Sequence, residues 1–432
     1  MDFLTTRGGA AASFRAALFD GLAPDGGLYV PAAIEPWTAD ELARLPRRTL
    51  TEIALRALRP FARGDVDPAT LEALLVEALN FPIPLVEIEP GVHVLELFHG
   101  PTLAFKDVGA RVMARLMAVL HDRDEPLTVL AATSGDTGSA VAHAFHRVPR
   151  TRVVILYPDG RVSPTQEAQL TMFNDQRTNV RAYAVAGSFD DCHRLTRQAL
   201  ADAELRARMR MTSANSVNIG RLLPQMVYYF HAVAQLQQSA GKPTANPLFV
   251  ATPSGNFGNL TAGLMAKRAG LGVERYIAAT NVNDVVPSYL ETGEFCPRPS
   301  VRTLANAMDV GHPSNFERML WLYDRDAGAM QRDIVGSRSD DDQIRTAIRD
   351  VFSRTGYLMD PHSAIGYLGL RRCGGAGVFL ATAHPAKFAE IVGPIIGRAV
   401  DPPQALSEAL ARPRHIVRIA STFDAVRSIL AG

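Results

Sequence analysis

Lysine is rare in this chain, and one lysine lies where it could do chemistry. Of the 45 basic residues only four are lysines, Lys106, Lys242, Lys267 and Lys387. Arginine can replace lysine in salt bridges but not in imine formation, because a guanidinium keeps its proton whereas an amine can lose it and attack a carbonyl. Lys106 lies in the loop HGPTLAFKD. It is a candidate for attachment of pyridoxal phosphate (PLP), although a solvated lysine at a helix start is the commoner interpretation of such a residue alone.

Two glycine-containing loops each follow an apolar run and precede a helical pattern. In Ser254-Gly-Asn-Phe-Gly-Asn259, the glycines let the backbone approach an anion and the next helix adds its positive end, which suits a phosphate monoester. The loop lacks the G-x-G-x-x-G of dinucleotide sites and the Gly-Lys-Ser/Thr of a P-loop. Thr133-Ser-Gly-Asp-Thr-Gly138 has the same design and could hold a carboxylate. Taken alone, each is as readily a turn or a helix cap.

Three further polar segments stand at expected helix starts or strand ends. Residues 212–218 (TSANSVN) precede Arg221 and could bind a second anion, although capping and a surface arginine are the slightly favoured interpretation. Thr382 could share a hydrogen bond with a ring nitrogen, and His384 could be an acid or base but is more typical of a structural histidine. Asp360 is more typical of a helix cap than of a catalyst. Together, a loop lysine, two anion loops and a strand-end threonine supply the parts that a PLP enzyme needs.

The chain alternates short apolar runs with helical patterns after about residue 92. Strands are expected at 92–97, 127–131, 152–157, 180–185, 247–252, 276–280 and 377–382. A long helix is expected from 219 to 238, and residues 1–90 are expected to be helix-rich. Strands separated by helices predict parallel sheets with helices on both faces, and ligands then bind beyond the carboxyl ends of the strands, where every motif above lies.

Three domains are expected. An N-terminal domain takes residues 1–90. A smaller α/β domain at 91–215 carries Lys106 and the TSGDTG loop, and a larger one at 216–432 carries the SGNFGN loop. These borders are approximate, and the domains are expected to interleave.

The bulk properties exclude several classes of protein. The 432 residues are 47% apolar and carry a net charge of +1, so nothing predicts binding to nucleic acid or acidic membranes. We find no run of 18 apolar residues and no signal peptide after Met1. Cys192, Cys296 and Cys373 are too far apart for a zinc site or a disulfide framework. The expectation is a cytoplasmic enzyme with no metal.

Seven segments together resemble one known family. They are HGPTLAFKD, TSGDTG, SANSVN, PSGNFGN, ATNVND, DPHSAIGY and TAHPAKF. They resemble segments of threonine synthases, PLP enzymes of the tryptophan-synthase-like fold (fold type II). Thr6-Arg7-Gly8 and the run Asp25-Gly-Gly-Leu-Tyr-Val-Pro31 resemble the N-terminal domain of the longer microbial and fungal branch. The resemblance runs in order along essentially the whole chain.

The resemblance implies a fold and a set of site residues. The implied fold is α/β, with two parallel-sheet three-layer (αβα) domains and an added N-terminal helical domain. Lys106 would carry PLP and act as the catalytic base, and Thr382 would face the pyridine nitrogen. The cofactor phosphate would lie on Gly255, Asn256, Phe257, Gly258 and Asn259. The substrate carboxylate and a cofactor oxygen would be surrounded by Thr133, Ser134, Gly135, Asp136 and Thr137. The candidates for the substrate phosphate are Ser213, Asn215, Asn218 and Arg221.

The resemblance also implies a reaction. O-Phospho-L-homoserine and water would give L-threonine and phosphate by γ-elimination and β-hydration, a carbon–oxygen lyase reaction that ends threonine biosynthesis, in a monomer or weak homodimer. One alternative is a PLP-dependent phospho-lyase or serine/threonine dehydratase, which would release a 2-oxo acid. Another is a silent homologue that binds no PLP. A nicotinamide dehydrogenase is disfavoured because the dinucleotide fingerprint is missing.

Overall fold

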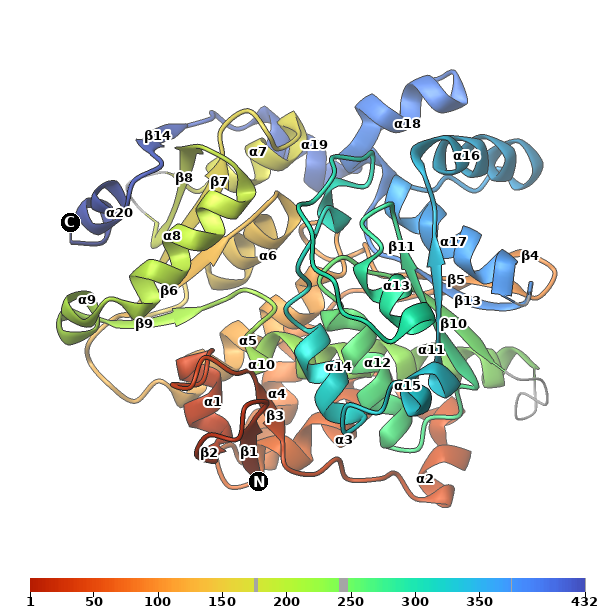
Figure 1. Ribbon diagram of the computed structural model, residues 1–432, viewed down its shortest axis with the longest axis horizontal. Helices are drawn as coiled ribbons and strands as arrows, with labels where there is room; N and C mark the ends of the chain where they lie inside the picture. The colour runs from red at the N-terminus through yellow and green to blue at the C-terminus, as the bar shows by residue number, and fades with distance from the viewer. Residues whose placement is uncertain (175–177, 241–247, 374, 432) are drawn as a thin grey trace.

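Two sheets stand side by side above a small N-terminal region. The structure, a computed structural model, describes residues 1–174, 178–240, 248–373 and 375–431. A five-stranded sheet lies on the left in Figure 1, a six-stranded sheet on the right, and the N-terminal segment, in red, below both. Within these ranges, no helix is both long and apolar enough to cross a membrane.

The six-stranded sheet has helices on both faces. Its order is β12-β11-β10-β13-β5-β4, and every pair is parallel except β4 with β5. The strands are β4 (Leu85–Glu89), β5 (Val92–Glu96), β10 (Phe249–Pro253), β11 (Arg275–Thr280), β12 (Ile334–Arg338) and β13 (Gly377–Ala381). Alternate residues enter different cores: Val250 and Tyr276 join the large central core, whereas Ala251 and Ile277 pack with helices α16 (Asp341–Thr355) and α17 (Pro361–Cys373).

The five-stranded sheet is parallel throughout, with the order β14-β8-β7-β6-β9. Its strands are β6 (Leu127–Ala132), β7 (Thr151–Pro158), β8 (Val180–Ala186), β9 (Arg210–Ser213) and β14 (Val417–Ala420). Val129 and Ile155 join the central core, whereas Leu130 and Leu156 pack with residues of α8 (Phe189–Ala201) and α20 (Phe423–Ala431). The predicted arrangement of parallel sheets covered by helices on both faces is confirmed.

The remaining helices connect and cover the sheets. After the N-terminal region they are α5 (Lys106–Leu120), α6 (Asp136–Phe145), α7 (Pro164–Thr171), α9 (Ala203–Arg208), α10 (Ile219–Leu222), α11 (Met226–Ala240), α12 (Gly258–Arg268), α13 (Val285–Thr292), α14 (Phe316–Leu322), α15 (Ala327–Asp333), α18 (Ala389–Ile396) and α19 (Gln404–Ala411). Short 3₁₀ turns occur at Leu45–Arg47, Leu223–Gln225, Asn306–Met308 and Pro385–Phe388. The long helix predicted over 219–238 is interrupted at Leu223–Gln225, because Pro224 has no N–H to continue the helical ladder.

The predicted strands are present, but several others escaped prediction. Strands β4, β9, β12 and β14 are short and lie at sheet edges, and their sequences (LVEIE, RMTS, IVGSR and VRIA) mix polar with apolar residues. The expected strand at 247–252 begins at Pro247, which lies outside the described residues. The two sheets also interleave along the chain, since β4 and β5 join the strands that follow residue 248, whereas β14 joins the earlier ones. The domain borders at 90/91 and 215/216 stay a prediction.

The N-terminal region is rich in helices, as expected, and it also carries a small sheet. It contains α1 (Phe14–Asp20), α2 (Ala39–Ala43), α3 (Leu50–Ala62) and α4 (Pro68–Ala78). It also has a three-stranded antiparallel sheet of β1 (Asp2–Thr5), β2 (Ala12–Ser13) and β3 (Tyr29–Pro31). The longest of these strands has four residues, which is too short for alternation to identify it.

One buried arginine joins the N-terminal sheet to the rest of the molecule. Arg318 of α14 is 1% exposed, and its guanidinium donates to the carbonyls of Tyr29 on β3 (3.0 Å), Ser216 (3.2 Å) and Val217 (2.6 Å), and to Oδ1 of Asn315 (2.6 Å). Burial lowers the pKa of Arg318 to about 9, so the side chain stays cationic at neutral pH. Four acceptors from three separate segments therefore share one cation.

Replacing Arg318 with methionine should destabilise the protein. The change keeps an unbranched apolar stem but leaves buried carbonyl oxygens without a donor, at about 1–3 kcal/mol for each. We expect the thermal unfolding midpoint to fall by about 5 °C or more. The matched control is Arg345→Met, since Arg345 is a partly exposed arginine that pairs with Asp342 at 3.5 Å. Equal midpoints for the two variants would show that Arg318 does not hold these segments together.

Candidate active site

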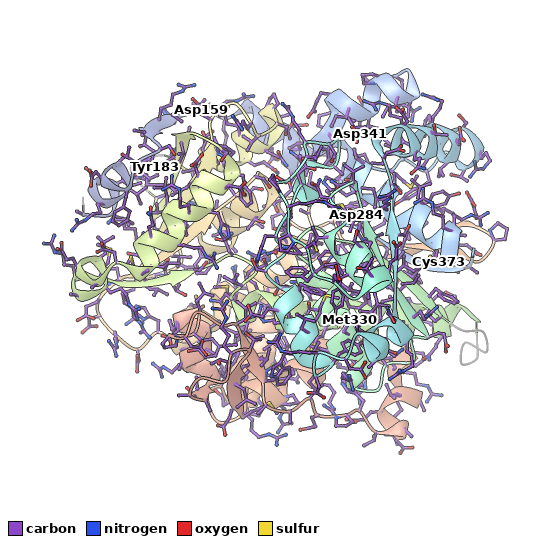
Figure 2. All side chains as sticks on the ribbon, viewed as in Figure 1. Asp159, Tyr183, Asp284, Met330, Asp341 and Cys373 are labelled. Carbon is purple, nitrogen blue, oxygen red and sulfur yellow. The ribbon has the colours of Figure 1, made fainter. Side chains whose placement is uncertain are left out.

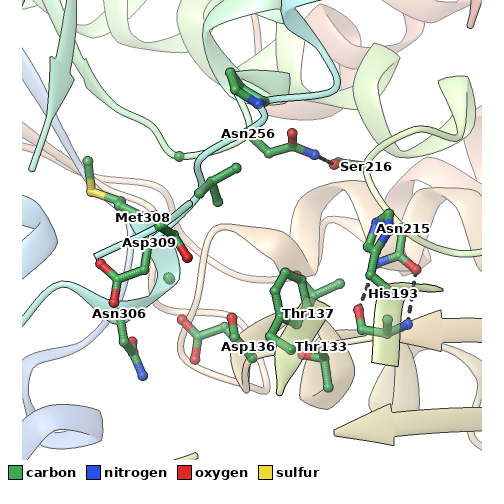
Figure 3. Close-up of a pocket in the computed structure, with 18 of the residues that line it drawn as sticks. Thr133, Asp136, Thr137, His193, Asn215, Ser216, Asn256, Asn306, Met308 and Asp309 are labelled. Carbon is green, nitrogen blue, oxygen red and sulfur yellow. Dashed lines mark hydrogen bonds between the residues drawn. The ribbon is translucent and has the colours of Figure 1, made fainter. Parts of the chain in front are cut away.

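A cavity of about 1570 Å³ lies at the carboxyl ends of the parallel strands of both sheets. Figure 3 shows Asp136 and Thr137 on one side of it and Met308 and Asp309 on another. The structure brings most of the predicted site residues to its wall, namely Lys106, Thr133, Ser134, Asp136, Thr137, Asn215, Arg221, Gly255, Asn256, Phe257, Gly258, Asn259 and Thr382. The predicted residues Gly135, Ser213 and Asn218 are not part of the lining.

The loop before Lys106 is held against the end of β13. The carboxylate of Asp107 is buried and accepts hydrogen bonds from the backbone N–H (2.8 Å) and the hydroxyl (2.7 Å) of Thr102, which closes the loop. The N–H of Phe105 donates to the carbonyl of Thr382 at 2.9 Å. Lys106 therefore begins α5 beside the threonine that was predicted to face a ring nitrogen.

Two lysines flank the buried carboxylate of Asp136. Nζ of Lys106 lies 3.7 Å from Oδ2, and Nζ of Lys387 lies 2.7 Å from Oδ1. Nε2 of Gln166 also donates to Oδ1, at 3.1 Å. No role for Lys387 is expected from the sequence alone. Two signals in the sequence mark it: lysine is scarce in the chain, and Lys387 belongs to the TAHPAKF segment; two of the four lysines meet at this one carboxylate.

The charges around Asp136 set the protonation of this cluster. Burial lowers the pKa of the Lys106 amine; Asp136 opposes this shift, and Lys387 and Arg221 reinforce it. Burial acts to raise the pKa of Asp136, but the charges of Lys387 and Lys106 outweigh it and hold that pKa well below its usual range. The site thus combines a fixed carboxylate with an amine that loses its proton more readily than a solvated lysine does.

The loop before Asp136 turns tightly into helix α6. The hydroxyl of Thr133 accepts hydrogen bonds from the backbone N–H groups of Gly135 (2.9 Å) and Gly138 (2.8 Å). Gly135 has φ 137°, and a Cβ there would collide with the side chain of Gln166, so glycine is required. The start of α6 thereby faces the cavity with its positive end, which suits a carboxylate.

The second glycine loop is tied to neighbouring segments by Asn256. Nδ2 of Asn256 donates to the hydroxyl of Ser216 (2.6 Å), as Figure 3 shows, and its Oδ1 accepts from the N–H of Ser314 (2.5 Å). Phe257 has φ 58° and caps the eleven-residue helix α12. Asn259 is bonded within the loop, through the hydroxyl of Ser254 (2.5 Å).

The geometry of this loop fits a phosphate group. A Cβ on Gly255 would lie 2.7 Å from Cα of Met308, and a Cβ on Gly258 would lie 3.3 Å from Nδ2 of Asn315. Within the described ranges, Nδ2 of Asn315 is buried without a hydrogen-bond partner. A phosphate group binds at a helix N-terminus, against glycine backbone that it can approach closely and beside a hydrogen-bond donor that has no other partner. The residues present therefore fit PLP, whose phosphate this loop would hold and whose aldehyde Lys106 would hold.

The polar segment 212–218 serves two purposes. Asn215 lines the cavity and exchanges two hydrogen bonds with the backbone of Ala132, at 2.7 and 3.1 Å. Asn218 is fully buried, and its amide donates to the carbonyls of Leu18 (2.8 Å) and Ser213 (3.0 Å). The hydroxyl of Ser213 accepts from the N–H of Asn215 (3.2 Å), and neither Ser213 nor Asn218 lines the cavity, so their binding of substrate phosphate stays a prediction.

Arg221 is a buried cation with unused hydrogen-bonding capacity. Only 4% of it is exposed, and Nη1 donates to the carbonyl of Ala214 at 2.6 Å. Its Nε has no partner among the residues that the structure describes. Burial lowers its pKa to about 10, so it remains positive at neutral pH. The slightly favoured interpretation of this segment, with Arg221 on the surface, is therefore wrong. Arg221 lines the cavity, as a residue of an anion site must.

The segment 297–314, which no motif predicted, lines another side of the cavity. The ATNVND motif anchors it: Nδ2 of Asn281 donates to Asp309 (2.9 Å) and Oδ1 of Asn283 accepts from the N–H of Val301 (2.7 Å). The carboxylate of Asp284, labelled in Figure 2, pairs with Arg298. Burial raises the pKa of Asp309 to about 6.

Asp360 and His384 have the structural roles that their types favoured. Asp360 accepts from the N–H of Ser363 (2.9 Å) at the start of α17 and lies 2.5 Å from Nδ1 of His362. Nε2 of His362 accepts from the N–H of Ala307 (3.3 Å), which connects α17 to the cavity segment. His384 accepts from the N–H of Ala386 (3.1 Å), and burial lowers its pKa to about 4. Over the described ranges, no group of acidic, histidine and cysteine side chains could hold a metal.

Comparisons with known proteins identify the family of this chain. Residues 76–382 match the family model described as pyridoxal-phosphate dependent enzyme, residues 2–79 the threonine synthase N terminus, and residues 363–430 the threonine synthase C-terminal region. The threonine synthase of Escherichia coli is 42% identical over 97% of this chain and 96% of its own length.

Solved structures match over the whole chain. The crystal structure of the Escherichia coli threonine synthase has a TM-score of 0.93 and 40% identity, covering 100% of this chain and 99% of that one. The PLP-bound threonine synthase of Brucella melitensis has a TM-score of 0.91 and 37% identity, covering 100% and 98%. The resemblance stated from the seven motifs is thereby confirmed. This chain belongs to the threonine synthase family of PLP-dependent enzymes.

Proposed function

We propose that this chain converts O-phospho-L-homoserine and water into L-threonine and phosphate, with PLP attached to Lys106. The observation that carries the proposal is the grouping of a partly buried amine whose pKa is lowered, two helix-start anion loops and the buried cation Arg221 in one cavity. A doubly anionic amino acid needs one site for its carboxylate and another for its phosphate, beyond the one that the cofactor phosphate takes. The cavity offers all three.

The cofactor site is formed by residues from both sheets. Lys106 would hold the aldehyde, the loop 255–259 with Asn315 would hold the phosphate, and Thr382 would face the ring nitrogen. PLP supplies an electron sink that stabilises negative charge on a bound amino acid. A threonine hydroxyl does not keep a proton on the ring nitrogen as a carboxylate would, so base placement and anion binding carry more of the catalysis.

The side chains of the chain divide the remaining work. The α6 start with Thr133 binds the substrate carboxylate and fixes the orientation of the α-carbon. The amine of Lys106 takes the α-proton and then transfers a proton at the β-carbon. This is general acid–base catalysis at two neighbouring atoms. Arg221 binds the phosphate and stabilises the charge that grows as phosphate leaves the γ-carbon. Water adds at the β-carbon to complete threonine.

The reaction products test the proposal. Purified protein loaded with PLP is incubated with O-phospho-L-homoserine, and the amino acid is identified by mass while phosphate is counted. We expect one threonine for each phosphate released. Phosphate accompanied by a 2-oxo acid and ammonia would instead identify a phospho-lyase, and no release at all would identify a silent homologue.

Replacing Lys106 with arginine should abolish turnover while preserving charge. A guanidinium cannot form the bond to PLP and cannot serve as a base at neutral pH. We expect no threonine above the rate without enzyme and no visible absorbance from lysine-bound PLP. Near-normal activity in Lys106→Arg would remove Lys106 from the reaction. Lys267→Arg is the control, since that lysine pairs with Asp333 on the surface, at 2.9 Å.

Replacing Arg221 with alanine should weaken binding of the phosphorylated substrate. Loss of a charge-assisted contact costs about 1.5–3 kcal/mol, which raises KM roughly 10- to 100-fold. Arg221→Lys should recover part of that loss because it restores the charge. Steady-state kinetics would measure the effect, with circular dichroism to confirm folding and Arg345→Ala as the surface control. An unchanged KM in Arg221→Ala would place the substrate phosphate elsewhere.

A further inference from the structure

Lys387 is a buried cation that the proposed chemistry leaves unused. Its side chain is 0% exposed and is not part of the cavity lining. Its ammonium lies 2.7 Å from Oδ1 of Asp136 and donates to the carbonyl of Thr102 at 2.8 Å. It therefore touches the carboxylate beside Lys106 and also the loop that carries Lys106. A buried charge is costly unless it is paired and hydrogen-bonded, so the function of the Lys387 ammonium at this place has to be explained.

The distances show which lysine balances Asp136. The Lys387 contact is a hydrogen-bonded pair, whereas the Lys106 contact, at 3.7 Å, is longer than a hydrogen bond. If Lys387 were absent, Lys106 would be the cation left beside a buried carboxylate. That carboxylate would then hold the proton on Lys106, because an opposite charge within about 4–6 Å favours the charged form.

We propose that Lys387 is a positioning residue that neutralises the charge of Asp136 and thereby leaves the Lys106 nitrogen free to give up its proton. This inference rests on the proposed attachment of PLP to Lys106. Lys387 lies in the 3₁₀ turn Pro385–Phe388, shortly after Thr382, so one segment would place both the residue at the ring nitrogen and the counter-charge. Lys387 acts through Asp136 and contacts neither substrate nor cofactor.

The other charged groups nearby do not replace Lys387. Arg221 also faces Lys106 and has the same sign as Lys387, but it forms no ion pair with Asp136 among the pairs found in the described residues. Burial raises the pKa of Asp107, whose carboxylate accepts hydrogen bonds from the N–H and the hydroxyl of Thr102. Burial lowers the pKa of His384 to about 4, so this ring is neutral at physiological pH. Asp136 is therefore the anion that acts on Lys106, and Lys387 the cation that offsets it.

The test is the pH dependence of the lysine–PLP linkage in the holoenzyme. The protonation midpoint is read from the visible absorbance of bound PLP and, independently, from the rate at which cyanoborohydride, which requires the protonated linkage, reduces it. Lys387→Met should raise the midpoint by about one unit or more, because Asp136 is then unbalanced. Asp136→Asn should lower it, and the double variant D136N/K387M should return it close to the wild-type value. Lys267→Met, which removes a surface lysine, should leave it unchanged.

The variants separate this inference from a general loss of structure. An unshifted midpoint in Lys387→Met would overturn the proposal. If Lys387→Met fails to fold, the variants D136N and D136N/K387M test the proposal instead. Equal protonation midpoints in D136N and the wild type would overturn the proposal. A double variant that folds again and has a near-wild-type midpoint would support it. The absorbance and reduction measurements require only that PLP is bound, not that the protein turns over substrate. Failure of the wild-type protein to form threonine would therefore refute the proposed reaction and leave the balance between Asp136 and Lys387 standing.

Discussion

The burial of one carboxylate constrains the whole site. Asp136 follows β6 of the five-stranded sheet, Lys387 follows β13 of the six-stranded sheet, and Lys106 begins the helix α5. A buried anion must be paired, so this contact fixes how the ends of the two sheets face each other across the cavity. The same contact sets the protonation of the amine, and therefore fold and chemistry depend on one group.

A second buried cation extends this dependence to the N-terminal region. Arg318 gathers the carbonyls of Tyr29, Ser216 and Val217 around Asn315, whose amide nitrogen remains available at the phosphate loop. The N-terminal sheet, which carries none of the predicted site residues, is thereby connected to Ser216 and Val217, which line the cavity. This gives the added domain a physical role in supporting the site.

The sequence predicts those parts of the site that local pattern determines. Apolar strands followed by glycine loops locate both anion loops and Lys106, because strand, loop and helix are adjacent in the chain. Lys387 could not be predicted, since its meaning comes from a contact with Asp136 that is distant in sequence. The sequence also cannot show that the Asn218 amide donates to the carbonyls of Leu18 and Ser213, because an amide at a helix start looks the same whether it faces a ligand or a backbone carbonyl. Edge strands such as β14 are not predicted, because pairing with a neighbouring strand and not an alternating sequence pattern makes them strands.

The most direct test of this account is to locate PLP on the chain. Borohydride reduction of the holoenzyme fixes the cofactor to the lysine that holds it, and peptide mass mapping then identifies that residue. The account predicts the pyridoxyl group on Lys106, with Lys387 unmodified beneath the cavity wall. A pyridoxyl group on Lys387 would exchange the roles of the two lysines and contradict both the proposed base and the proposed counter-charge.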